Sequence, residues 1–149
     1  MQYSLAIEAV RALNEFNPPG IKWKAQYRLD RNLRKLSNAA GEFEFLRDRL
    51  QWSAKKDQSK SSHKPDGSAD LTPEEHLIFS DKLRKLFDEE VVVEIQPVVV
   101  LDSEQGQEPI GEELFIDLAE LRAAKYPLSR SVRSILFEAG VFTEPGKKG

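Results

Sequence analysis

The side chains best suited to chemistry are cations and aromatic rings gathered between positions 22 and 36 of the sequence. Four of the cations are spaced four, three and four positions apart, so in a helix they share one face. Cations contact phosphates and aromatic rings stack on bases, which makes the set typical of a surface that binds a nucleic acid or an anionic nucleotide. The alternative is a solvated helix flank whose cations pair with carboxylates of the same protein. The candidate residues are Lys24, Arg28, Arg31, Arg34, Lys35, Trp23 and Tyr27.

Groups that catalyse reactions or hold metals are few. The two histidines, His63 and His76, have no partner at metal-ligand spacing, and the chain has no cysteine, so we expect no metal, no cofactor and no thiol chemistry. The glycine patterns of phosphate-binding loops and the GxSxG pattern of serine hydrolases are also absent from the sequence. Carboxylates are numerous, and two of them brought together from distant segments would suit a hydrolase. We rank that function last and expect a protein that is not an enzyme.

The basic residues belong to a segment with strong helical periodicity. Residues 22–52 contain no proline and a single glycine, Gly41, and their apolar residues advance in steps of three or four. A helix of this length extends about 45 Å, further than a small globule is wide. We therefore expect it to pack along other helices, or along another subunit in an oligomer. The apolar stripe comprises Ala25, Leu29, Leu33, Leu36, Ala40, Phe43, Leu46 and Leu50.

A second helix, predicted for residues 72–90, would return along the first as a long hairpin. Its start is marked by Thr72, Pro73 and Glu75, which have the spacing of a capping box with proline at the first helical position. Between the helices, residues 53–70 lack any large apolar side chain, and we predict a flexible loop there. Six aromatic residues are expected to form core or subunit contacts: Trp23, Trp52, Phe43, Phe45, Phe79 and Phe87.

The strong β signal lies at residues 91–101, VVVEIQPVVVL. Pro97 cannot donate to a ladder, so it indicates an edge strand, a bulge or two short strands. The partner is left open: the segment itself folded around Pro97, a weaker segment elsewhere, or another subunit. Further helices are expected at residues 3–16, at 112–125 and after the cap residue Ser129, with Gly140 as the terminator and 143–149 as a frayed tail. The sequence thus predicts one domain, 1–149, of the α+β class and mainly α.

The charge is distributed unevenly along the chain. Residues 1–64 carry 13 Lys and Arg against 7 Asp and Glu, while residues 65–149 carry 9 against 18. We expect the two halves to neutralise each other within one chain or between subunits, the alternative being a basic face that binds an anion. No apolar run reaches the roughly 18 residues of a membrane span and the first residues do not read as a signal peptide, so we expect a cytoplasmic protein that does not contact membranes.

Several segments resemble a group of small bacteriophage and prophage proteins of unknown function. In that group a basic helix of the pattern Y-x-L-x-x-N-L-x-K-L precedes a glutamate-rich stretch, a polar loop, a helix, a strand and a final short helix. The resemblance implies a phage origin and a bacterial host cytoplasm, and it supplies no active site. The segments that carry it are Lys24 to Leu36 (KAQYRLDRNLRKL), Glu42 to Glu44, Arg47 to Leu50 and Phe87 to Val98 (FDEEVVVEIQPV).

From these observations we expect a non-enzymatic phage accessory protein that acts by protein–protein contact, in particle assembly or by inhibiting a host factor. The second hypothesis is a nucleic-acid or nucleotide binder that uses the basic helix face. The third is the carboxylate-based hydrolase.

Overall fold

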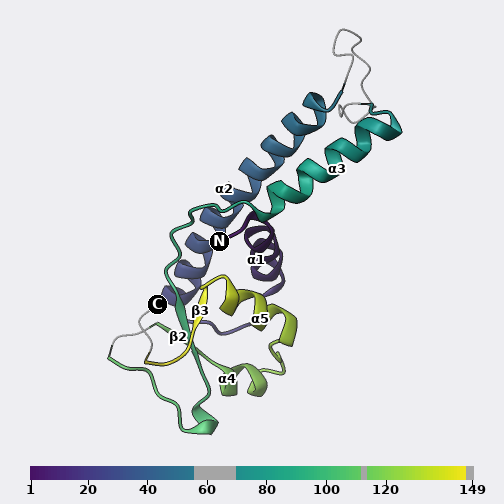
Figure 1. The fold of residues 1–149 in the computed structure, drawn as a ribbon. Coiled ribbons are helices and arrows are strands. Elements are labelled where there is room, and N and C mark those ends of the chain that lie inside the picture. Colours follow the sequence, from purple (N-terminus) through teal and green to yellow (C-terminus); the bar gives the residue numbers. More distant parts are fainter. Residues whose placement is uncertain (56–69, 112–113, 147–149) are drawn as a thin grey trace.

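The computed structural model describes residues 1–55, 70–111 and 114–146. Helices dominate, and three short strands form one sheet, so the predicted α+β, mainly α class is confirmed (Figure 1). The helices α2 and α3 form an arm that projects away from a body made of α1, α4, α5 and the sheet (Figure 1). The elements are α1 (Tyr3–Glu15), α2 (Trp23–Ser53), α3 (Pro73–Asp88), β1 (Val98–Leu101), a 3-10 turn η1 (Ser103–Gln105), β2 (Phe115–Asp117), α4 (Leu118–Ala123), α5 (Arg130–Glu138) and β3 (Phe142–Thr143).

The arm is the predicted helical hairpin. Its returning helix, α3, begins with the expected capping box: the Thr72 hydroxyl accepts a hydrogen bond from the Glu75 amide at 3.2 Å, and the Glu75 carboxylate accepts one from the Thr72 amide at 2.9 Å. Of the predicted loop 53–70, Ser53 still belongs to α2 and Lys55 is buried, so the loop does not begin at 53. Residues 56–69 lie outside the described part of the chain.

The core joins the first half of α2 to the body. Ala25, Leu29 and Leu36 of α2 are buried against α1, α5 and the sheet. A smaller cluster forms where the arm leaves the body, with Tyr3 of α1 and Phe43 of α2 at its centre. The Phe43 ring lies 4.6 Å from that of Phe87 and 5.8 Å from that of Tyr3, between centroids. The long helix therefore serves two packing units, one in the body and one at the root of the arm.

The sheet is parallel, with β1 between β2 and β3. All four residues of β1 are buried, as expected for a parallel strand covered on both faces. The predicted strand 91–101 is too long, because only Val98–Leu101 joins the sheet, and Pro97, which cannot donate to a ladder, stands directly before it. Its partners are weaker segments elsewhere, one of the three alternatives left open: Val99 pairs with Phe115, and Val98 with Phe142.

The helix predicted for 112–125 is wrong at residues 114–117, and its first two residues, 112 and 113, lie outside the described part of the chain. Phe115–Asp117 forms β2 beside β1, and the helix α4 begins only after Asp117, whose carboxylate accepts a hydrogen bond from the Ala119 amide as the N-cap. The last helix is confirmed, with Ser129 as its cap and Gly140 in the left-handed region at φ 79°.

The frayed tail predicted for 143–149 does not start at 143, because Thr143 belongs to β3. Residues 147–149 of that predicted tail lie outside the described range. Within the parts that the structure describes, no helix combines the length and the apolar character needed to cross a membrane.

Candidate binding surfaces

The seven candidate residues lie on the first turns of α2, at the end of the helix that belongs to the body; we call them the basic–aromatic face. Trp23 is 73% exposed and Tyr27 59% exposed, so neither enters the core of the chain. The Lys24 ammonium lies 5.7 Å from the centre of the Trp23 ring, and the Arg31 guanidinium lies 5.9 Å from that of Tyr27. At these distances a cation is attracted by the electrons of the ring face. The face therefore presents aromatic rings and cations together to the solvent.

The cations of the basic–aromatic face differ in their exposure to solvent. Lys24, Arg31 and Arg34 are exposed, and Lys35 is half-buried beside a groove between α2 and the segment 91–94. Arg28 is half-buried as well, and its Nη1 donates a hydrogen bond to the backbone carbonyl of Pro97 at 3.2 Å. Arg28 thus holds the segment before β1, a role that its helical spacing did not indicate.

The cations of the basic–aromatic face form no ion pair with any residue that the structure describes. The ion pairs of the described side chains join neighbours in the fold, such as Lys85 with Asp81 and Arg122 with Asp102. We predicted that the acidic half would neutralise the basic half within one chain. Among the described residues, no carboxylate pairs with the cations of this face. Pairing between subunits stays a prediction.

A groove runs along the arm between α2 and α3, with a volume of about 490 Å³. Its floor is apolar, and most of its charged residues are cations. The Arg49 guanidinium lies 5.8 Å from the centre of the exposed Phe45 ring, and Lys85 pairs with Asp81 at 3.3 Å. Hydrogen bonds from Arg84 and Lys85 hold the pKa of Asp81 below its usual range, so this carboxylate stays charged. The residues of this arm groove are Leu46, Arg49, Leu50, Ser53, Lys82, Lys85, Leu86 and Glu89.

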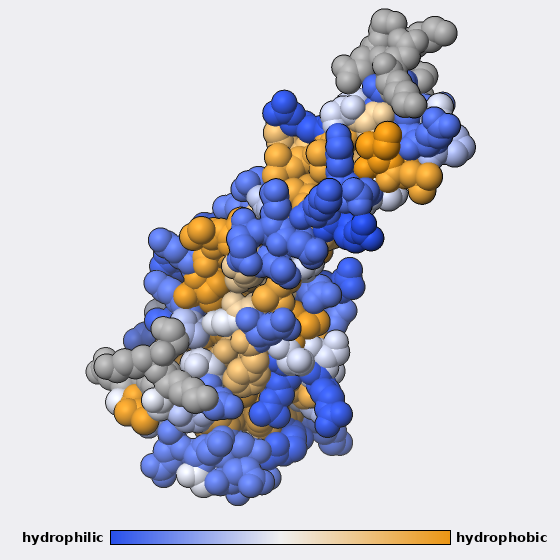
Figure 2. Space-filling model, in the orientation of Figure 1, coloured by the Kyte–Doolittle hydropathy of each residue, from blue (hydrophilic) through white to orange (hydrophobic). Residues whose placement is uncertain are grey.

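Large apolar side chains are also exposed on the arm. Phe45 is 61% exposed, Leu77 73% and Ile78 42%, and Figure 2 shows hydrophobic residues gathered over the outer parts of both arm helices. Phe43 and Phe79 are buried as predicted, whereas Phe45 and Trp23 are not in the core. Sequence reasoning missed the arm groove, because its floor residues Leu46 and Leu50 belong to the apolar stripe that was assigned to packing. For the exposed apolar surface, the available signal was Phe45, Leu77 and Ile78, which lie outside the stripes.

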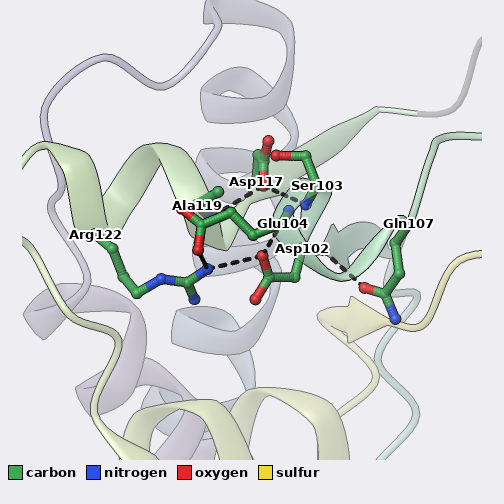
Figure 3. A network of polar contacts seen from close by, with 7 residues as sticks. All are labelled: Asp102, Ser103, Glu104, Gln107, Asp117, Ala119 and Arg122. Atoms are coloured by element: carbon green, nitrogen blue, oxygen red, sulfur yellow. Dashed lines mark hydrogen bonds and ion pairs between the residues drawn. The ribbon is translucent and has the colours of Figure 1, made fainter.

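The carboxyl ends of β1 and β2 bring acidic side chains together, an arrangement of described residues that could suggest catalysis (Figure 3). Asp117 Oδ1 accepts hydrogen bonds from the amides of Ser103 and Ala119, each at 3.0 Å. Arg122 bridges two other carboxylates, with Nη2 2.8 Å from Asp102 Oδ1 and 3.0 Å from Glu104 Oε2. The network joins the turn after β1 to the start of α4.

The electrostatics of this network do not suit a general acid. Burial raises the pKa of Asp117, but the hydrogen bonds from Ser103 and Ala119 outweigh it and leave the pKa below its usual value. The bond from Arg122 likewise lowers the pKa of Asp102, and the same pair raises the pKa of Arg122. A carboxylic acid that donates a proton near neutral pH needs a raised pKa. Among the described residues, no group of three acidic or histidine side chains is placed to hold a metal ion.

No known protein family, curated protein or solved structure matches this chain significantly.

Proposed function

We propose that this protein is a non-enzymatic binding protein whose α2–α3 arm contacts another protein. The observation that carries the proposal is the exposed apolar surface on the arm, made of Phe45, Leu77, Ile78 and the floor of the arm groove. An apolar surface on a projecting element is typical of a protein–protein contact.

The construction of the arm explains why this surface is open. At the root, Tyr3 and Ile7 of α1 cover the junction of the two arm helices. Further out, the described part of the chain supplies no third helix over them (Figure 1). Two helices alone can bury only the stripes that face each other, so leucines at the edges stay half-exposed, as Leu46 and Leu50 do. A partner protein would complete this packing.

We propose further that this is a phage accessory protein that acts in the cytoplasm of a bacterial host, either in particle assembly or on a host factor. Its support is the resemblance of residues 24–36 and 87–98 to small phage proteins.

A photo-crosslinking side chain tests the contact in cells of the natural host. We place it at Ile78 on the arm and, as a matched control, at the exposed Glu138 of α5. The proposal expects a discrete crosslinked protein from position 78 that persists after nuclease treatment and is missing from position 138. Identical crosslinks from both positions, or none from position 78, would contradict it.

A second candidate function is binding of a polyanion such as single-stranded nucleic acid through the basic–aromatic face. The observation in its favour is the pair of exposed rings beside cations that lack ion pairs with described residues. Phosphates release counterions from such a surface, so the affinity should fall steeply as salt increases.

Arg31→Glu with Arg34→Glu tests this second function without disturbing the fold, since both side chains are exposed. Arg28 is a poor probe because it holds the Pro97 carbonyl. Fluorescence anisotropy with a labelled single-stranded oligonucleotide should show weaker binding and a shallower salt dependence. The same charge change at the exposed Arg130 of α5 should leave both unchanged.

A further inference from the structure

We propose that the arm groove receives an acidic amphipathic helix of the partner protein. The inference rests on the proposed function of the arm and adds the chemistry of the segment that is bound. It is carried by the shape of the groove, by the sign of the charges along it and by their order from the body outward.

The floor of the groove fits the side chains of one helix. Leu46, Leu50 and Leu86 form it, and the wall from Leu46 to Ser53 of α2 extends about 10 Å at 1.5 Å per residue. Two turns of a docked helix occupy that length. A helix that lies in such a groove uses apolar anchors spaced three or four residues apart. The groove therefore accommodates two anchors of one helical face.

The charges select an acidic helix. Three cations, Arg49, Lys82 and Lys85, border the groove against one carboxylate, Glu89. Asp81 pairs with Lys85, whereas neither Lys82 nor Arg49 makes an ion pair with a described residue. Glutamates or aspartates beside the two apolar anchors would match this border, and complementary charges raise both the association rate and the specificity.

The order of the charges gives the docked helix a direction. The contact between Phe43 and Phe87 sets the register of the antiparallel arm, so Glu89 lies at the inner end of the groove, and Lys82 and Arg49 lie further out. A helix carries partial positive charge at its N-terminus and partial negative charge at its C-terminus. Its N-terminus is therefore favoured beside Glu89, and the docked helix runs outward, parallel to α2.

A second copy of this chain suits the groove less well. In a two-fold contact the same surface meets itself, so the two cationic borders would face each other. Like charges brought together across an interface oppose association.

Two short synthetic helices test the proposal against the full chain. Both carry leucines at positions i and i+4, flanked by glutamates in one peptide and by lysines in the other. Titration calorimetry should show binding of the glutamate peptide that weakens with salt, and at least about tenfold weaker binding of the lysine peptide. Arg49→Glu combined with Lys82→Glu should reverse this preference. The same charge change at the exposed Arg130 and Arg133 of α5, outside both candidate surfaces, should leave it intact, and circular dichroism checks that each variant is folded.

Equal affinity for both peptides, or no binding of the glutamate peptide, would overturn the proposal. So would a dimer of the free protein that Arg49→Glu with Lys82→Glu dissociates, because a second copy would then occupy the groove. Crosslinking from position 78 distinguishes a failure of the acidic-helix proposal from a failure of the proposed function of the arm. If position 78 crosslinks to a partner but the glutamate peptide does not bind, the arm contacts a protein, and that protein does not present an acidic helix to the groove.

Discussion

The side-chain amide of Asn32 makes paired hydrogen bonds with the backbone of Gln96, a residue 64 positions later in the chain. Asn32 Nδ2 donates to the Gln96 carbonyl at 2.8 Å, and Asn32 Oδ1 accepts from the Gln96 amide at 3.1 Å. Asn32 is 1% exposed, so its amide is shielded from water and relies on these two bonds. Together with Arg28, Asn32 fixes the segment before β1 against the long helix.

Asn32→Ala should therefore lower the free energy of unfolding by about 1–3 kcal/mol, because it removes two hydrogen bonds that the buried Asn32 side chain makes with the Gln96 backbone. Urea denaturation measures the loss. Asn38→Ala, at an exposed position of the same helix, serves as the control and should change stability by less than about 0.5 kcal/mol. Equal effects of the two substitutions would show that the paired bonds contribute little.

Asp117→Ala should destabilise the protein by about 1–2 kcal/mol at neutral pH, because Asp117 caps α4 and accepts the amide of Ser103. The pKa of Asp117 is lowered in the folded state, so the stability it contributes is fully present above the unfolded pKa of about 4 and is lost as pH falls through the folded value. Urea titrations at neutral pH and near pH 3 should show the difference from the parent protein shrinking in acid. The exposed Glu120 of α4 offers a control, Glu120→Ala, and an undiminished difference in acid would disprove the linkage.

The Tyr3 hydroxyl should ionise only at high pH. Burial and the hydrogen bond from its hydroxyl to the Glu42 carboxylate, 2.6 Å long, raise the pKa of Tyr3 to about 12. Its raised pKa stabilises the fold below about pH 10, and this contribution is lost as pH rises from 10 towards 12. In a spectrophotometric titration of phenolate absorbance, Glu42→Gln should lower the pKa of Tyr3, and Tyr3→Phe should remove the latest step. An unchanged titration in Glu42→Gln would assign the shift to burial alone.

Gly41→Ala should stabilise the protein by about 0.5–1 kcal/mol, since alanine restricts the unfolded chain and favours helix. Gly41 lies within α2, and a Cβ added there meets no atom within 4 Å. Gly140→Ala is the matched opposite: its φ of 79° strains any L side chain, so that variant should be less stable. Thermal melting of the two variants checks both signs, and destabilisation by Gly41→Ala would mean that the helix needs its glycine.

The arm was predictable because its signals are local. Thr72, Pro73 and Glu75 specify the start of α3 within four residues, and the steps of three or four in α2 give its buried side. The partners of β1 were not predictable in the same way. Phe115–Asp117 and Phe142–Thr143 are too short to carry a period-two pattern, and they become strands because they lie beside β1.

For the candidate surfaces, too, local features were predictable and features that depend on distant residues were not. Spacing alone placed Lys24 and Arg31 on one helix face, and the structure keeps them exposed there. The role of Arg28 depends on a carbonyl 69 positions away, which no local pattern encodes. The arm groove likewise exists only once Leu50 of α2 and Leu86 of α3 are in register, so no single segment shows it.

The order of the strands has a consequence for biosynthesis. Both neighbours of β1 follow it in the chain, the second ending at Thr143, while both arm helices are complete once residue 88 has been added. On the ribosome the arm can fold early, whereas the apolar residues of β1 wait for the last strand before they are shielded from other nascent chains. Ribosomal stalling between residues 101 and 143 would therefore leave a folded arm joined to a body that is prone to aggregate.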